Sequence, residues 1–264
     1  MKVLDKDELQ VAEQVLLQHL PKSYKVYGFI HVINRNKPTT QQVVVDSWPD
    51  FKVIICRPDL MVSSCPTGQL DTLFTALSGW SFSCNGGRFD FSHAPLLKEV
   101  SSDRKLNNSV STLVHLLHLP DINYLLPPAV DSELESRVSS LNLSHVDLVN
   151  KTWKYGGNER SYRNIKNLIS NFPSGCITDG QGEPVSWILM YDYCAMGMLY
   201  TLPEHRGKGH AKVLVSTMAK KLHAEGYPVY SFIEEDNMIS YKLFKNLGFI
   251  EDASYRAAWF EFLI

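Results

Sequence analysis

The sequence predicts an α/β fold with a mixed sheet, arranged as two related units in tandem over residues 1–125 and 126–264. A helical apolar pattern followed by three β-prone segments occurs in each half, although residue identity between the halves is negligible. From Leu119 to Ser140, prolines cluster with polar residues, which is typical of a join between units. A length of 264 residues suits one or two domains with ample core.

The first half is expected to begin with an amphipathic helix from Glu8 to Leu20, which Pro21 ends. Three strands separated by an Asn/Lys/Pro turn and a Trp-Pro-Asp turn are expected next, over Lys25–Ile33, Gln41–Asp46 and Lys52–Cys56. No glycine loop follows the third strand, because residues 57–60 read Arg-Pro-Asp-Leu.

The second half is expected to begin with two helices, over Ser144–Lys154 and Glu159–Ser170. Its strands are predicted at Gly175–Thr178, Val185–Tyr191 and Met196–Leu202. The run Asp-Gly-Gln-Gly at residues 179–182 predicts a hairpin turn between the first two of these strands.

The most informative segment is the glycine loop after the third strand of the second half. Pro203 ends the strand, because proline has no N–H to donate to a ladder. From residue 211 to 222 apolar residues recur at helical spacing, so a helix begins just after the loop. Gly207 and Gly209 allow a ligand to approach the backbone, and Arg206 and Lys208 add positive charge. A helix N-terminus in this setting binds anions, most commonly phosphate.

The spacing of residues in this loop indicates which class of phosphate ligand it binds. Arg206 to Ala211 reads R-x-x-G-x-A, which resembles the pyrophosphate loop of the GNAT acyltransferases, and neither a P-loop nor a dinucleotide-binding pattern is present there. A second segment agrees with this resemblance. After a strand at 228–233, Asn237 precedes a helix predicted over 238–247, which Gly248 ends. This is similar to the GNAT segment that flanks the thiol end of coenzyme A.

Longer runs resemble the glycine N-acyltransferase family within the GNAT superfamily. They extend from about residue 24 to the C-terminus and thin out between about 60 and 140: Lys25–Gly28, Ile33–Asn36, Asp46–Phe51, Ser144–Ser161, Asn171–Ser174, Gly182–Trp187, Thr201–Arg206 and Gly226–Ser231. The resemblance implies an acyl-CoA:amino acid N-acyltransferase that transfers an acyl group to the amine of glycine, with glutamine as the alternative acceptor. It implies two GNAT-like units, of which the first is non-catalytic and shapes the acceptor pocket.

The resemblance also implies which residues bind acyl-CoA. The backbone N–H of Leu199 is expected at the thioester carbonyl and that of Thr201 at the pantetheine arm. The full predicted set is Leu199, Tyr200, Thr201, Leu202, Arg206, Gly207, Lys208, Gly209, His210, Ala211 and Asn237.

The usual acid and base of the family are missing. The glutamate eleven residues before the loop arginine is replaced by Ala195, and the tyrosine seven residues after the motif asparagine by Phe244. A missing general base lowers the rate by about 10²–10⁴. The substitutes we predict are Glu234 first, then Asp192, with Tyr241 serving the leaving group, although a solvated carboxylate is the commoner role for such acids.

For the acceptor carboxylate we expect Asn158, Arg160 and Arg163, because arginine binds carboxylates bidentately. The alternative is that Asn158 simply caps the following helix and Arg160 is a surface charge. Two other functions stay open: an acetyl-CoA-dependent N-acetyltransferase, and an acyl-CoA-binding protein with little catalysis, which Ala195 and Phe244 suggest.

Composition excludes several classes. A net charge of −2 with 20% charged residues argues against a nucleic-acid partner. No apolar run reaches the ~18 residues that would predict a membrane span. Five cysteines without C-x-x-C spacing indicate reduced intracellular thiols and no metal site. The N-terminal residues resemble neither a secretory signal nor a transit peptide. We expect a monomer, mitochondrial by resemblance alone, with the cytoplasm as the alternative.

Overall fold

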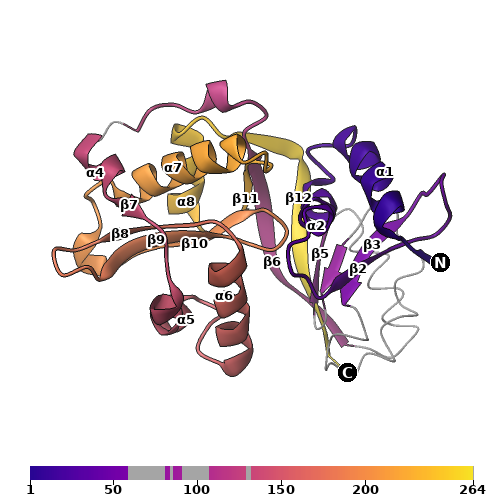
Figure 1. Ribbon diagram of the computed structural model, residues 1–264, viewed down its shortest axis with the longest axis horizontal. Helices are drawn as coiled ribbons and strands as arrows, with labels where there is room; N and C mark the ends of the chain where they lie inside the picture. Colours follow the sequence, from indigo (N-terminus) through magenta and orange to yellow (C-terminus); the bar gives the residue numbers. More distant parts are fainter. Residues whose placement is uncertain (59–80, 84–85, 91–106, 129–131, 264) are drawn as a thin grey trace. The chain divides into compact units, whose positions relative to one another are not determined.

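The computed structural model describes residues 1–58, 81–83, 86–90, 107–128 and 132–263 (Figure 1). The chain divides into two compact units that are not contiguous in sequence. The first unit comprises Met1–Leu116, Ile233–Asn237 and Glu251–Ile264, and the second Leu117–Phe232 and Met238–Ile250. The division into residues 1–125 and 126–264 stays a prediction.

The first unit opens with two helices and a small antiparallel sheet. Its helices are α1 (Lys6–Leu17) and α2 (Tyr24–Asn34), and its sheet has the order β1 (Lys2–Val3), β2 (Gln41–Val45), β3 (Ile54–Pro58). A further group of strands has the order β4 (Ser81–Ser83), β5 (Gly86–Asp90), β12 (Ile250–Leu263), β6 (Asn107–His118), and the ends of β12 and β6 extend into the second unit. The core between the helices and the small sheet includes Ala12, Ile30, Val32 and Cys56.

The segment Lys25–Ile33, predicted to be a strand, is a helix, so that prediction is wrong. Every residue from Tyr24 to Val32 is buried, and the helix therefore lacks the polar face that reveals a helical period. Because a short apolar run is compatible with either a buried strand or a buried helix, its pattern alone misleads. The first unit accordingly begins β1-α1-α2-β2-β3 instead of with one helix and three strands.

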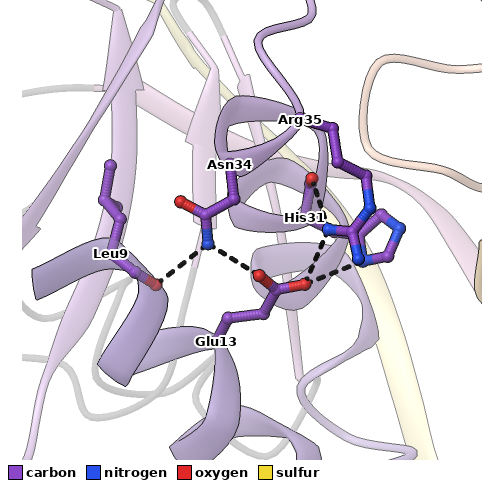
Figure 2. A network of polar contacts seen from close by, with 5 residues as sticks. All are labelled: Leu9, Glu13, His31, Asn34 and Arg35. Carbon is purple, nitrogen blue, oxygen red and sulfur yellow. Dashed lines mark hydrogen bonds and ion pairs between the residues drawn. The ribbon is translucent and has the colours of Figure 1, made fainter. Parts of the chain in front are cut away.

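A buried carboxylate joins the two helices of the first unit (Figure 2). One oxygen of Glu13 lies 2.8 Å from Nδ1 of His31 and accepts from Nη1 of Arg35 at 3.0 Å. The other accepts from Asn34 at 2.6 Å, and Asn34 also donates to the backbone oxygen of Leu9 at 3.2 Å. Burial raises the pKa of Glu13, but the hydrogen bonds from His31, Asn34 and Arg35 outweigh it and lower the pKa to about 2.

The second unit is a mixed sheet between two layers of helices. The strand order is β7 (Val138–Ser139), β8 (Ser174–Thr178), β9 (Pro184–Met190), β10 (Met196–Thr201), β11 (Tyr230–Glu234), antiparallel except for the parallel pair β10–β11. Figure 1 shows α7 on one side of these strands and α5 and α6 on the other. The helices are α4 (Ser132–Ser136), α5 (Val146–Thr152), α6 (Glu159–Asn171), α7 (His210–Ala224) and α8 (Met238–Asn246).

The second unit also contains short 3-10 turns, at Ile122–Tyr124, Leu143–His145 and Pro203–His205.

The second unit repeats the element order of the first, because β7-α5-α6-β8-β9 matches β1-α1-α2-β2-β3. Within the described residues, no helix has both the length and the apolar character that crossing a membrane requires.

The predicted hairpin at residues 179–182 is confirmed. Asp179 accepts hydrogen bonds from the amides of Gln181 at 2.8 Å and Glu183 at 3.0 Å, and Gly182 has a φ of +89°. These hydrogen bonds, with that from Glu183 the largest, lower the pKa of the Asp179 carboxyl. The turn brings β9 alongside β8, and every residue of β9 is buried between the helical layers.

Candidate functional site

The strand before the glycine loop contains a β-bulge. Regular pairing of β10 with β9 stops after Gly197 and resumes at Tyr200. The two residues between them, Met198 and Leu199, oppose the single residue Ile188 of β9. Met198 has a φ of +49°, a left-handed conformation that is uncommon for a side-chain-bearing residue. A bulge of this kind takes one residue out of the ladder and re-aims its backbone groups.

On the side of β10 that faces β11, the pairing between the two strands ends after the first residue of β10. In the described chain, the parallel register joins Met196 to Ser231 and includes no later residue of β10. The Ser231 hydroxyl donates to the backbone oxygen of Met196 at 2.9 Å. The backbone of β10 beyond Met196 therefore lies outside the β10–β11 ladder. This stretch contains Leu199 and Thr201, whose amides are predicted to meet the thioester carbonyl and the pantetheine arm.

The glycine loop leads directly into α7. The turn at Pro203–His205 is followed by Gly207 with a φ of +76° and Gly209 with a φ of +82°. A Cβ at Gly207 would meet nothing within 4 Å, so the backbone there borders open space. Gly209 caps α7 without a side-chain hydrogen bond. The first N–H groups of α7, a helix of 15 residues, therefore face the loop, and no side chain of the N-cap residue accepts a hydrogen bond from them.

Arg206 folds back onto the strand that precedes the loop. Its Nε donates to the backbone oxygen of Thr201 at 3.0 Å, and its guanidinium carbon lies 5.7 Å from the ring centre of Tyr200. Tyr200 in turn stacks on the buried Trp187 at 5.4 Å. The guanidinium thus ties the start of the loop to β10 while its charge stays at the exposed loop. Sequence reasoning assigned Arg206 to phosphate binding only and missed this contact.

The first residue of α7 is a buried histidine. Burial lowers the pKa of His210, and electrostatic interactions with His205, Lys208 and Arg137 lower it further, which disfavours the charged ring. Its ring lies 6.2 Å from that of His205. Among the described residues, no hydrogen-bond partner faces Nδ1 of His210. The positive charge of the loop therefore comes from Arg206 and Lys208.

The residues predicted for the acceptor lie at the start of α6. Asn158 accepts a hydrogen bond from the amide of Ser161 at 2.9 Å, so the helix-capping interpretation of Asn158 is confirmed. Arg163 forms an exposed pair with Glu159 at 3.7 Å, and Arg160 is exposed. Binding of an acceptor by Asn158, Arg160 and Arg163 stays a prediction.

Asn150 organises the turn between α5 and α6, which sequence reasoning did not foresee. Its side-chain oxygen accepts from the amide of Gly157 at 3.1 Å and from the Ser161 hydroxyl at 2.6 Å. A Cβ at Gly156 would lie 1.9 Å from the backbone oxygen of Asn150. Close packing against Asn150 thus requires glycine at 156, whereas Gly157 has open space around it and a φ of +88° that favours glycine. The sequence pattern does not reveal either requirement.

Comparison with known proteins identifies the family. The family model for aralkyl acyl-CoA:amino acid N-acyltransferases matches residues 1–65 and 91–173, and an FR47-like model matches residues 174–258. The chain belongs to the aralkyl acyl-CoA:amino acid N-acyltransferase family. This confirms the resemblance to the glycine N-acyltransferases and the GNAT superfamily, and it makes the chain an N-acyltransferase that uses acyl-CoA.

Its curated relatives match over nearly their whole length. Glycine N-acyltransferases of Rattus norvegicus and Homo sapiens are each 30% identical to this N-acyltransferase, over 89% of its chain and 90% of theirs. A glycine N-phenylacetyltransferase of Bos taurus is 30% identical over 92% of both chains. A solved Drosophila protein has the same fold, with a TM-score of 0.71 and 17% identity over 99% of this chain and 98% of its own.

In this N-acyltransferase the two positions that lack the usual acid and base are buried. Ala195 is 1% exposed, and Phe244 packs edge-on against Phe249 with ring centres 4.9 Å apart. The substitutes come from separate segments: Glu234 ends β11 in the first unit, whereas Asp192 lies in the β9–β10 turn and Tyr241 in α8 of the second unit. All three are half-buried, and their catalytic roles stay predictions.

Proposed function

We propose that this chain transfers the acyl group of an acyl-CoA to the amine of glycine, conjugating the amino acid and releasing free CoA. The observation that most supports this proposal is the bulge in β10 followed immediately by the glycine loop at the start of α7. Its family membership and the glycine acceptor named in its relatives favour the same reaction.

Acyl-CoA binding would use the two ends of this segment differently. The amides of the loop from Gly207 to Ala211, with the charges of Arg206 and Lys208, suit the diphosphate, because a helix N-terminus binds anions through fixed N–H groups. The backbone from Leu199 to Leu202 suits the pantetheine arm, since β10 has left its ladder with β11 there. Asn237 is proposed for the thiol end by resemblance alone. No metal is needed by this chemistry.

The reaction is a direct displacement at the thioester. The nitrogen of glycine attacks the carbonyl carbon, the C–S bond breaks, and the sulfur leaves as a thiolate that takes up a proton. The Leu199 amide would stabilise the developing negative charge on the carbonyl oxygen, a contribution of about 10²–10³ in kcat for one such donor. The attacking amine must lose a proton, and we propose Glu234 as its acceptor, then Asp192, with Tyr241 protonating the thiolate.

The glycine carboxylate is proposed to meet Arg160 or Arg163 near Asn158, where exposed guanidinium groups offer bidentate binding. Glutamine is the alternative acceptor, because a carboxylate grip of this kind suits any small amino acid. We propose a monomer located in mitochondria, with the cytoplasm as the alternative site.

One assay tests the proposal. Purified protein is incubated with acetyl-, phenylacetyl-, benzoyl- and medium-chain acyl-CoAs, each with and without glycine or glutamine, and free thiol is measured. We expect release that depends on glycine and on an acyl group larger than acetyl. Release from acetyl-CoA but from none of the larger acyl-CoAs would favour an N-acetyltransferase. Saturable CoA binding without release under any condition would favour the acyl-CoA-binding protein that the buried Ala195 and Phe244 suggest.

A further inference from the structure

A tyrosine ring lies directly on the glycine that precedes the β10 bulge. A Cβ built on Gly197 would lie 2.2 Å from Cε2 of Tyr191 and 3.1 Å from its Cδ2 and Cζ, far closer than carbon atoms pack. Gly197 is not among the glycines with positive φ, so its backbone admits an ordinary side chain. The ring of Tyr191, and not the backbone conformation, therefore requires glycine at this position.

The Tyr191 ring is itself held in place by the turn between β9 and β10. The amide of Tyr191 donates to the oxygen of Ala195 at 2.9 Å, and its own oxygen accepts from Cys194 at 2.9 Å. The ring stacks on Tyr193 with a centre distance of 5.1 Å and an angle of 5° between planes. The Tyr230 hydroxyl of β11 donates to the backbone oxygen of Tyr193. The ring is thus fixed by its own turn and, through Tyr193, by the neighbouring strand.

Met196, the residue before Gly197, is held by a hydrogen bond from the neighbouring strand β11. The Ser231 hydroxyl bonds the oxygen of Met196, the last residue of β10 that pairs with β11. The bulge then begins two residues later, with Met198 in the left-handed region. A ring pressed on Gly197 and a hydroxyl bound to Met196 together determine where β10 leaves its regular path.

We propose that the contact of Tyr191 with Gly197 positions the bulge for acyl transfer, so that the Leu199 amide points at the thioester oxygen. The inference rests on the proposed function. Tyr191 and Gly197 are positioning residues, because they act through the backbone of β10 and not on the substrate. Displacing a reacting group by about 1 Å can lower a rate by about 10²-fold, so the contact should be visible in kcat.

A double-mutant cycle tests the contact. Gly197→Ala forces the methyl into the ring and is expected to lower kcat by about 10²-fold, with the Kd for CoA unchanged within about threefold. Tyr191→Ala removes the ring and should lower kcat by about tenfold, whereas Tyr191→Phe, which keeps the ring, loses less. In the double variant the methyl fits the space left by the ring, so its kcat should equal that of Tyr191→Ala and exceed that of Gly197→Ala.

Gly175→Ala serves as the matched control. Gly175 lies in β8 of the same sheet, and a Cβ there meets its nearest atom, on Leu214, at an ordinary 3.4 Å. We expect kcat and Tm to stay near those of the unmodified protein. The inference is overturned if Gly197→Ala keeps its kcat, if the losses of the two single variants simply add in the double variant, or if kcat falls only in step with Tm and CoA affinity.

A crystal structure of the Gly197→Ala variant provides a readout that does not depend on turnover. We expect the ring of Tyr191 to be displaced and the bulge at Met198 to shift or vanish. An unchanged bulge with Met198 still left-handed would overturn the inference even in an active protein. If the unmodified protein releases no thiol from any acyl-CoA and acceptor, the proposed function fails, and this structure still decides whether the ring sets the bulge.

Discussion

Arg206 shows how one side chain of the glycine loop serves both structure and binding. Its Nε is bound to the oxygen of Thr201, and its guanidinium lies over Tyr200. Only a planar, forked cation meets both demands, because the donor and the stacked face belong to the same group. The arginine of the motif therefore fixes the shape of the loop as well as adding charge to it.

Arg206→Lys is expected to weaken CoA binding nearly as much as Arg206→Ala, by about tenfold, although the charge is kept. The lysine ammonium neither stacks on Tyr200 nor reproduces the bond from Nε. Titration calorimetry with CoA measures the Kd, with Lys212→Ala on the exposed side of α7 as the control. A Kd for Arg206→Lys equal to that of the unmodified protein would show that charge alone matters.

Glu234→Gln is expected to lower kcat at least about tenfold with little change in CoA affinity, because a general base contributes about 10²–10⁴ to the rate. The substitution keeps the size of the half-buried side chain at the end of β11 and removes only its ability to take a proton. Steady-state thiol release gives kcat, and Asp192→Asn provides the comparison. Unchanged turnover would remove Glu234 as the base.

Glu13 should make the first unit sensitive to acid. Its pKa is about 2 in the folded protein against an ordinary 4.5, so its carboxylate stabilises the fold fully above about pH 4.5. The stabilisation is lost as the pH falls from there toward 2, because the unfolded chain then binds the proton more readily. Glu13→Gln should cost about 1–3 kcal/mol at pH 7 and flatten this acid dependence. Urea unfolding from pH 3 to 7 measures the free energy of unfolding of both proteins. If that free energy falls as steeply with acid in the variant as in the unmodified protein, Glu13 is not the group responsible.

At the scale of elements, the glycine loop and its helix were predictable because local residues determine them. Pro203 ends the strand, and the apolar spacing after residue 210 is helical, so the structure agrees closely with the prediction for α7. The hairpin at Asp179 was equally predictable, because its carboxylate and Gly182 build the turn from within. In such segments sequence and fold are linked over a few residues.

Other elements depend on distant partners and could not be predicted. The helix α2 was mistaken for a strand because its surroundings bury all sides of it. The bulge at Met198 depends on the register with β9 and on the ring of Tyr191, and neither appears in the local pattern. For the same reason the sequence was compatible with Asn158 either as the N-cap of α6 or as a residue that binds the acceptor. The hydrogen bond from the Ser161 amide to Asn158 then established that it caps the helix.

Gly207→Ala and Gly182→Ala separate backbone strain from ligand contact. Both glycines have positive φ, +76° and +89°, and a Cβ at either meets nothing within 4 Å. Each substitution should therefore cost a similar ~1–2 kcal/mol of stability. Only Gly207→Ala should also weaken CoA binding, by tenfold or more, because its methyl occupies the space proposed for the diphosphate. Thermal unfolding measures the stability of both variants, and calorimetry measures their CoA affinity. Equal CoA affinity in the two variants would argue against diphosphate binding at the glycine loop.

At the scale of the whole molecule, two units share the order strand, two helices, two strands, and in the second unit a strand, a glycine loop and a long helix follow. The segment that follows β3 in the first unit, residues 59–80, lies outside the described residues, so the absence of a glycine loop there stays a prediction from the sequence at 57–60. The family assignment spans both units, since its relatives align over about nine-tenths of the chain. The diphosphate of acyl-CoA is accordingly expected to bind in the second unit, at the glycine loop before α7.

The most direct test of the account is the response of the loop amides to the diphosphate of the cofactor. In ¹⁵N-labelled protein, NMR resonances of residues 207–211 are followed during titration with CoA and, separately, with pantetheine, which has the thiol arm but no diphosphate. We expect CoA to shift the amides of Gly207 to Ala211 most strongly, and pantetheine to leave them unchanged while it shifts Leu199 and Thr201. Saturating CoA that leaves residues 207–211 unmoved would contradict it.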